Sequence, residues 1–162
     1  MAQQRTRSTS PKSGTDTEFK LPSARDLMHK IAIVESEKAS ESLRRDEAAA
    51  AEKKALLDRL SKPSGRTDEE VMRRAHSIIE RAVNSGHTSV QVFRFPNELC
   101  TDRGRAINQA EPGWEKTLTG LPKEMYEFWG RRLRPLGYKL KVQIVDWPGG
   151  MPGDVGITLK WA

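Results

Sequence analysis

Residues 138–162 read YKLKVQIVDWPGGMPGDVGITLKWA, two alternating runs separated by a loop of proline and glycine. Apolar and polar side chains alternate with a period of two in both runs, which is typical of strands with one buried face. The apolar positions are Tyr138, Leu140, Val142 and Ile144 in the first run, and Val155, Ile157, Leu159 and Trp161 in the second. The pattern predicts an antiparallel hairpin around the loop at 148–154.

Two helices are expected upstream of this hairpin. Thr67 is a suitable N-cap for a helix that ends near Gly86, and the acidic residues of its first turn suit the positive end of the helix dipole. Apolar residues recur at steps of three and four along this helix, which indicates that one face packs on a core. The second helix is expected after Pro122, a residue typical of first turns, and it ends near Gly137.

A third strand is expected at 87–96, where β-branched and aromatic residues are frequent. Its apolar phase changes between Val92 and Phe93, which indicates either burial on both faces or a β-bulge. A long connection that contains a helix separates it from the strand at 138–147, so the simplest arrangement is a parallel pair with a right-handed crossover. We therefore expect an α+β fold with a small mixed three-stranded sheet, made of a β-α-β crossover and the C-terminal hairpin, packed by two helices.

The chain divides into three expected segments. Residues 1–20 are polar and basic, and they predict a flexible, disordered arm because burial cannot offset the entropy of ordering them. Residues 21–62 predict a long helical stalk from their helix propensity. Pro63 and Gly65 end the stalk, and residues 66–162 are expected to form a compact α/β domain that folds by itself.

The stalk carries a short apolar stripe formed by Leu27, Ile31 and Val34. Lys38 and Glu41 interrupt it where a heptad seam requires apolar residues, so a continuous coiled coil is not predicted. Two interpretations remain, a solvated stalk or a helix for protein docking or self-association.

Composition excludes several classes of protein. With one cysteine the chain has no intramolecular disulfide and no cysteine-based zinc cage, and its three histidines lack metal-ligand spacing. No metal or other cofactor is therefore expected. Neither a signal sequence nor a membrane span is expected, and we predict a cytoplasmic protein that does not contact a membrane.

The formal net charge of +6 is spread along the chain, with an excess of two positive charges in residues 1–20, one in 21–65 and three in 66–162. A dedicated nucleic-acid binder usually concentrates positive charge in one tail or on one face. The sequence shows no such block, so the charge gives nucleic-acid binding little support.

The segment at 97–114, NELCTDRGRAINQAEPGW, is long for an irregular loop, which indicates either a functional segment or a wrong assignment of its elements. If the strands at 87–96 and 138–147 are parallel, it meets the loop at 146–154 at one sheet edge, where open α/β sheets bind ligands. The expected site comprises the loops at 97–120 and 146–154. Its candidate ligand- or partner-binding residues are Cys100, Asp102, Arg103, Arg105, Asn108, Trp114, Asp146 and Asp154.

Several of these candidates also have a structural interpretation. Arg103 and Arg105 flank Gly104 and could grip a phosphate or carboxylate, or they could pair with acidic residues and hold the loop to the sheet. Asn108 is either a turn or cap residue or a ligand contact. Trp114 either packs on the core or offers a stacking surface.

Three functions remain open from the sequence. The first is a non-enzymatic binding module that presents the two loops to a protein or an anionic partner. The second is RNA or DNA binding through the arm and the basic residues Arg131, Arg132, Arg134, Lys139 and Lys141. The third is a small enzyme around Cys100, but no histidine is placed to activate this thiol, and the pattern favours a small buried hydrophobe.

Overall fold

The computed structural model describes residues 20–162, so the arm expected at 1–20 lies outside the described residues except for Lys20. The chain forms two units, Met1–Asp46 and Glu47–Ala162. We call the described part of the first, residues 20–46, the N-terminal unit, and Glu47–Ala162 the C-terminal unit. Helix α1 (Ala24–Leu60) begins in the first unit and ends in the second. Within residues 20–162, no helix has the length and apolar character needed to cross a membrane.

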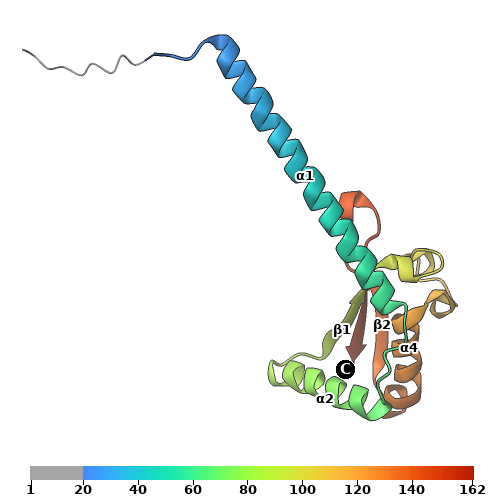
Figure 1. Ribbon diagram of the computed structural model, residues 1–162. Coiled ribbons are helices and arrows are strands. Elements are labelled where there is room, and N and C mark those ends of the chain that lie inside the picture. Colours follow the sequence, from blue (N-terminus) through green and yellow to red (C-terminus); the bar gives the residue numbers. More distant parts are fainter. Residues whose placement is uncertain (1–19) are drawn as a thin grey trace, which may run out of the picture. The chain divides into compact units, whose positions relative to one another are not determined.

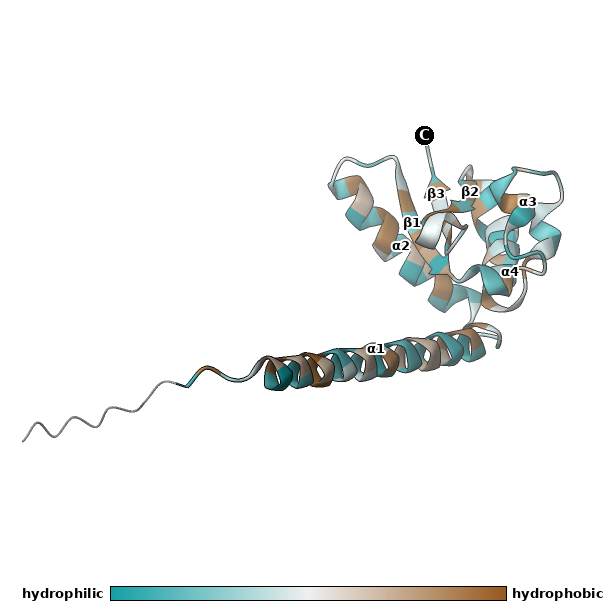
Figure 2. Cartoon of the chain, turned by 90° about the horizontal axis from the view of Figure 1, so that it is seen from above, coloured by the Kyte–Doolittle hydropathy of each residue, from teal (hydrophilic) through white to brown (hydrophobic). Residues whose placement is uncertain are grey.

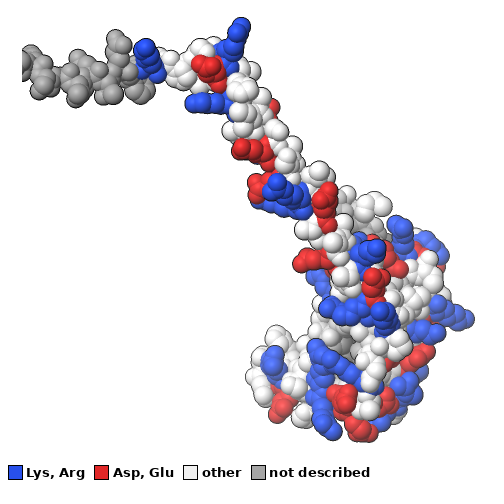
Figure 3. Space-filling model, viewed as in Figure 1, with Lys and Arg blue, Asp and Glu red and all other residues white. Residues whose placement is uncertain are grey.

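In the N-terminal unit, α1 begins at Ala24, within the stretch at 21–62 for which the sequence predicts a helical stalk. The backbone N–H of Asp26 donates a 3.1 Å hydrogen bond to Ser23 Oγ, which is the usual N-cap contact. The apolar stripe of Leu27, Ile31 and Val34 is exposed. Along α1, apolar and polar residues are mixed (Figure 2) and acidic and basic side chains are interspersed (Figure 3).

The C-terminal unit contains a three-stranded sheet made of β1 (Ser89–Phe95), β2 (Lys139–Ile144) and β3 (Val155–Lys160) (Figure 1). With helices packed on this sheet, the fold is α+β, as the sequence predicts. The strand order is β1-β3-β2, and β3 is antiparallel to both neighbours. The hairpin of β2 and β3 is confirmed.

The sequence predicts a mixed sheet in which the strands at 87–96 and 138–147 form a parallel pair. This prediction is wrong. Strands β1 and β2 run in the same direction, but β3 lies between them and forms hydrogen bonds with both. The physical reason is burial: the three apolar side chains of β3 are its most buried residues, so the central position shields them best. They are Val155, Ile157 and Leu159, and each is at most 2% exposed.

Strand β1 contains a β-bulge, one of the two alternatives that its sequence allowed. The register with β3 shifts between Gln91 and Phe93. As a result, both Val92 and Phe93 pack against the hydrophobic core, although they are neighbours in the chain.

Two helices cover one face of the sheet, α2 (Asp68–Asn84) and α4 (Gly120–Phe128), as Figures 1 and 2 show from two directions. Thr67 caps α2 by accepting a 3.3 Å hydrogen bond from the backbone N–H of Glu70, as expected. Helix α4 continues into a π-helical turn, η3 (Trp129–Leu133). The remaining short elements are η1 (Asn97–Leu99), α3 (Arg105–Asn108), η2 (Trp114–Thr117), η4 (Arg134–Leu136) and η5 (Pro148–Gly150).

The last turns of α1 belong to the core of the C-terminal unit. Leu60 is only 6% exposed, and Leu56 and Leu57 pack against the same cluster. A fragment of residues 66–162 would lack these three side chains. Independent folding of that fragment stays a prediction, whereas the compact unit seen in the structure starts at Glu47.

Candidate functional site

The loops that follow β1 and β2 meet at one edge of the sheet. The side-chain amide of Asn97 donates a 2.9 Å hydrogen bond to the carbonyl oxygen of Pro152. Both loops line one depression with a volume of about 440 Å³, which we call the loop depression. The sequence predicted this meeting because β1 and β2 do run in the same direction, even though they do not pair.

Two of the candidate acids hold the loop of the hairpin to β1. Arg94 Nε donates to Asp154 Oδ2 at 2.8 Å, and Arg94 Nη2 donates to Asp146 Oδ2 at 3.1 Å. Asp146 also accepts a hydrogen bond from the backbone N–H of Asp154. Arg94 was missed as a site residue, and its place between the apolar Phe93 and Phe95 was the signal that it points to the other face of the strand.

The carboxylate of Asp102 organises the start of α3. It accepts hydrogen bonds from the backbone N–H groups of Gly104 (3.0 Å) and Ala106 (2.9 Å). Arg105 Nη1 donates to Glu111 Oε1 at 2.7 Å, an ion pair within the loop itself. Both residues therefore act as structural partners of their own loop.

Arg103 and Asn108 differ from these residues. Arg103 has a positive φ of 56° and forms no ion pair within residues 20–162. It lines the loop depression together with Asn108, as the paired residues Arg105, Asp146 and Asp154 also do. On the rim, Lys53 pairs with Glu98; partial burial alone would raise the pKa of Glu98, but Lys53 and the charge of Arg103 hold it below its usual range.

Cys100 and Trp114 face the core. Cys100 is 3% exposed, and burial, with a smaller contribution from Asp102, raises the pKa of its thiol to about 11. The thiolate needed of a nucleophile is therefore scarce near neutral pH. Trp114 makes an edge-to-face contact with Tyr126, with ring centroids 5.5 Å apart.

The basic residues of the nucleic-acid hypothesis lie on two sides of the sheet. Lys139 and Lys141 are exposed on β2 and alternate with the half-buried Leu140 and Val142, so they project from the face opposite the core. The three arginines lie on the helical side, after α4. They are Arg131, Arg132 and Arg134.

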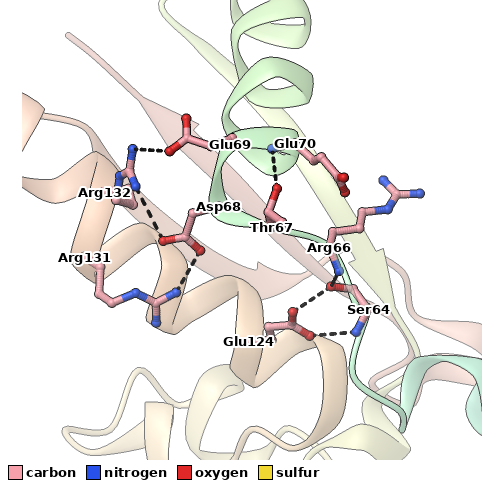
Figure 4. A network of polar contacts seen from close by, with 9 residues as sticks. All are labelled: Ser64, Arg66, Thr67, Asp68, Glu69, Glu70, Glu124, Arg131 and Arg132. Atoms are coloured by element: carbon pink, nitrogen blue, oxygen red, sulfur yellow. Dashed lines mark hydrogen bonds and ion pairs between the residues drawn. The ribbon is translucent and has the colours of Figure 1, made fainter.

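Two of these arginines already have acidic partners. Arg131 pairs with Asp68 at 3.2 Å, and Arg132 pairs with Asp68 and Glu69 at 3.7 Å each (Figure 4). Arg134 lies over the ring of Trp129, 5.7 Å from its centroid. The face of the C-terminal unit seen in Figure 3 likewise carries acidic side chains among the basic ones.

A larger cavity of about 590 Å³ lies between α2 and α4, over the core face of the sheet. We call it the α2–α4 groove. Its lining is mainly apolar, with contributions from the sheet (Phe93, Ile157), from α2 (Ala75, Ile78) and from α4 and η3 (Met125, Leu133). No aspartate or glutamate belongs to the lining.

Four cations also line the groove: Arg59, Lys62, Arg66 and Arg74. All four residues are exposed, so their charged groups lie at the mouth of the groove rather than at its floor. Among the described residues, none of them forms an ion pair. The groove therefore combines an apolar interior with positive charge at its rim.

The segment that carries Lys62 and Arg66 is fixed by a carboxylate on α4. Glu124 accepts hydrogen bonds from the backbone N–H of Ser64 at 3.0 Å and from its hydroxyl at 2.6 Å. In Figure 4 the side chain of Arg66 points away from this carboxylate. The backbone of the segment between Lys62 and Arg66 is thus anchored to α4 at Ser64.

Sequence reasoning missed the groove, because its lining residues range from Arg59 to Leu159 and no local motif unites them. No group of three or more histidine, cysteine, aspartate or glutamate side chains within residues 20–162 could hold a metal ion. No protein-family model, curated protein sequence or solved structure matches the chain.

Proposed function

We propose that the protein is a non-enzymatic binding module whose C-terminal unit holds a small, partly apolar ligand in the α2–α4 groove. One observation carries this proposal, the apolar crevice of about 590 Å³ between two helices and a sheet. Small-molecule sites in proteins are typically concave, mostly apolar and of this size, with a few polar groups that orient the ligand.

The residues of the C-terminal unit support binding better than catalysis. Cys100, the only nucleophile considered from the sequence, is buried, its thiol has a raised pKa, and it does not line the groove. The groove itself offers cations and apolar groups but no carboxylate that could act as a general base.

The proposal is tested by titrating the full chain with Nile red, a neutral dye that fluoresces in apolar surroundings. We expect saturable binding of one dye per chain. Ala75→Trp, which places an indole in the groove from α2, should abolish it. Ser77→Trp is the matched control, because Ser77 lies on the same helix, is exposed and does not line the groove.

Thermal melts of both variants establish that they fold. If Ala75→Trp does not fold, Met125→Trp fills the groove from the opposite wall and takes its place. Unchanged dye binding in a folded groove-filling variant, or no binding by the unaltered chain, would refute a ligand site in the groove.

The loop surface at 97–120 and 146–154 is a second candidate for contact with a protein or anionic partner. The observation in its favour is Arg103, which lines the loop depression and has no ion pair among the described residues. Arg103→Ala should then weaken binding of such a partner without changing the melting temperature. Equal binding by both forms would leave this surface structural.

The proposal also includes self-association through α1, because the apolar stripe of Leu27, Ile31 and Val34 is exposed. Sedimentation of the full chain and of Ile31→Asp tests it, since a charge in the stripe should shift a self-associating chain toward monomer. A cytoplasmic setting, expected from the single cysteine, is also part of the proposal.

A further inference from the structure

The α2–α4 groove has positive charge at its rim and apolar side chains in its interior. Arg59, Lys62 and Arg66 come from one short stretch at the end of α1 and the connection to α2, and Arg74 lies on α2 itself. The interior of the groove is lined by apolar side chains, among them Met125 of α4 and Leu133 of η3. A ligand that satisfies both the rim and the interior has one anionic end and one apolar end.

The floor of the groove is almost fully buried. Ile157 and Leu159 are each 2% exposed, and Phe128 is 4% exposed, although all three line the groove. None of the large hydrophobic residues that are exposed in the C-terminal unit, such as Val83 and Leu136, belongs to the lining. A helix with its side chains is about 10 Å wide and binds to an exposed apolar strip, which this groove does not offer.

We propose, on the basis of the proposed groove site, that its ligand is a single-chain anionic amphiphile, a fatty carboxylate in chemical class. The alkyl chain displaces water from the apolar crevice. The carboxylate accepts charge-assisted hydrogen bonds from the rim cations, which have no acidic partner of their own within residues 20–162.

Two quantitative features follow from this chemistry. Burial of each additional methylene should tighten the dissociation constant by about fourfold until the crevice is full. Reversal of rim charges should weaken binding of the carboxylate by about tenfold or more, because hydrogen bonds to charged groups are among the stronger ones. The same reversal should leave a neutral ligand unaffected.

The experiment is displacement of Nile red from the full chain by saturated carboxylates of eight to fourteen carbons, each below its micelle concentration, and by the primary alcohols of equal length. The charge variant is the double substitution Arg66→Glu and Arg74→Glu, at two exposed rim positions. Arg73→Glu is the control, because Arg73 is exposed and adjacent on α2 but does not line the groove.

We expect carboxylates to displace the dye at lower concentrations than alcohols, an advantage that the double variant loses and Arg73→Glu keeps. Equal potency of acid and alcohol, or an unchanged acid affinity in the double variant, would overturn the anionic head group. If the dye binds but no carboxylate or alcohol displaces it, the amphiphilic ligand is refuted, whereas the groove site is not. If the dye does not bind the unaltered chain, the proposed groove site itself is refuted.

Discussion

The loop depression and the α2–α4 groove both have charged side chains around them, but the loop depression pairs most of its charges within the chain, with Arg103 as an exception. Around the loop depression, Arg94 pairs with two aspartates and Arg105 pairs with Glu111. At the rim of the groove, Arg66 and Arg74 form no ion pair among the described residues. Charge that is paired within the chain fixes a conformation, whereas unpaired charge beside apolar space remains available to a ligand.

The two regions also differ in the interactions that hold them together. The loops depend on hydrogen bonds from side chains to backbone, because they contain little regular structure. The groove wall depends on close packing of α4 against the end of α1, where Gly120 meets Leu60 and Ser61. Substitutions in the two regions should therefore fail for different physical reasons.

The largest effect is expected from Gly120→Ala at the groove wall. Gly120 has a φ of 58°, and a Cβ there would overlap the Leu60 carbonyl oxygen and lie 2.9 Å from Ser61 Cα. We expect the free energy of unfolding to fall by about 3 kcal/mol from backbone strain and overpacking together. Urea denaturation measures it.

Gly113→Ala is the matched control for this prediction. Gly113 has a φ of 84°, but a Cβ there has no atom within 4 Å. The loss should be limited to about 1 kcal/mol for the left-handed conformation. Equal losses in the two variants would show that conformation alone matters and that the close packing of the groove wall does not.

The next largest effect concerns the buried thiol beneath the loops. The folded pKa of Cys100, about 11, is above the ordinary value of 9.0, so its contribution to stability is complete below pH 9 and is lost as the pH rises through 11. We expect a loss of about 2 kcal/mol over this range, which Cys100→Ala should not show. Urea denaturation at pH 8 and pH 11 checks the difference, and parallel declines in both proteins would contradict it.

A smaller effect is expected from Asp102→Ala in the loop. The substitution removes the acceptor of two backbone N–H groups, those of Gly104 and Ala106. The free energy of unfolding should fall by about 1 kcal/mol, the usual cost of losing a cap. Asp102→Asn keeps one acceptor oxygen and should retain part of this stability. A loop that tolerates Asp102→Ala without loss would not be held by polar contacts.

The smallest effects separate paired from unpaired arginines. Arg105→Ala removes the exposed ion pair with Glu111 and should cost about 0.5 kcal/mol. Arg74→Gln removes a cation without a partner among the described residues and should leave the melting temperature unchanged or slightly higher. A clear loss of stability in Arg74→Gln would mean that the groove cations are structural after all.

The elements of the C-terminal unit were predictable because their signals are local. Alternation along 138–144 and 155–160 predicted the hairpin, and Thr67 marked the start of α2. The phase change at Val92 indicated the bulge as one alternative. These signals depend on neighbours within a few residues, which the sequence displays directly.

Strand order was not predictable in the same way. The length of the connection between β1 and β2 is compatible with direct pairing, and local pattern does not show which strand becomes central. The burial of Val155 and Ile157 decides it, since β3 is covered on both edges by its neighbours. The prediction that the two loops meet is nevertheless correct, because β1 and β2 run in the same direction.

The sequence by itself determined the α+β class, the start of α2, the hairpin and the edge where the loops meet. Only the tertiary structure decided which charges find partners: Arg94 lies between Asp146 and Asp154, whereas Arg59 and Arg74 line an apolar groove. The physical reason is distance along the chain. Secondary structure follows from neighbouring residues, but pairing and cavities depend on side chains brought together from segments as distant as Arg59 and Leu159.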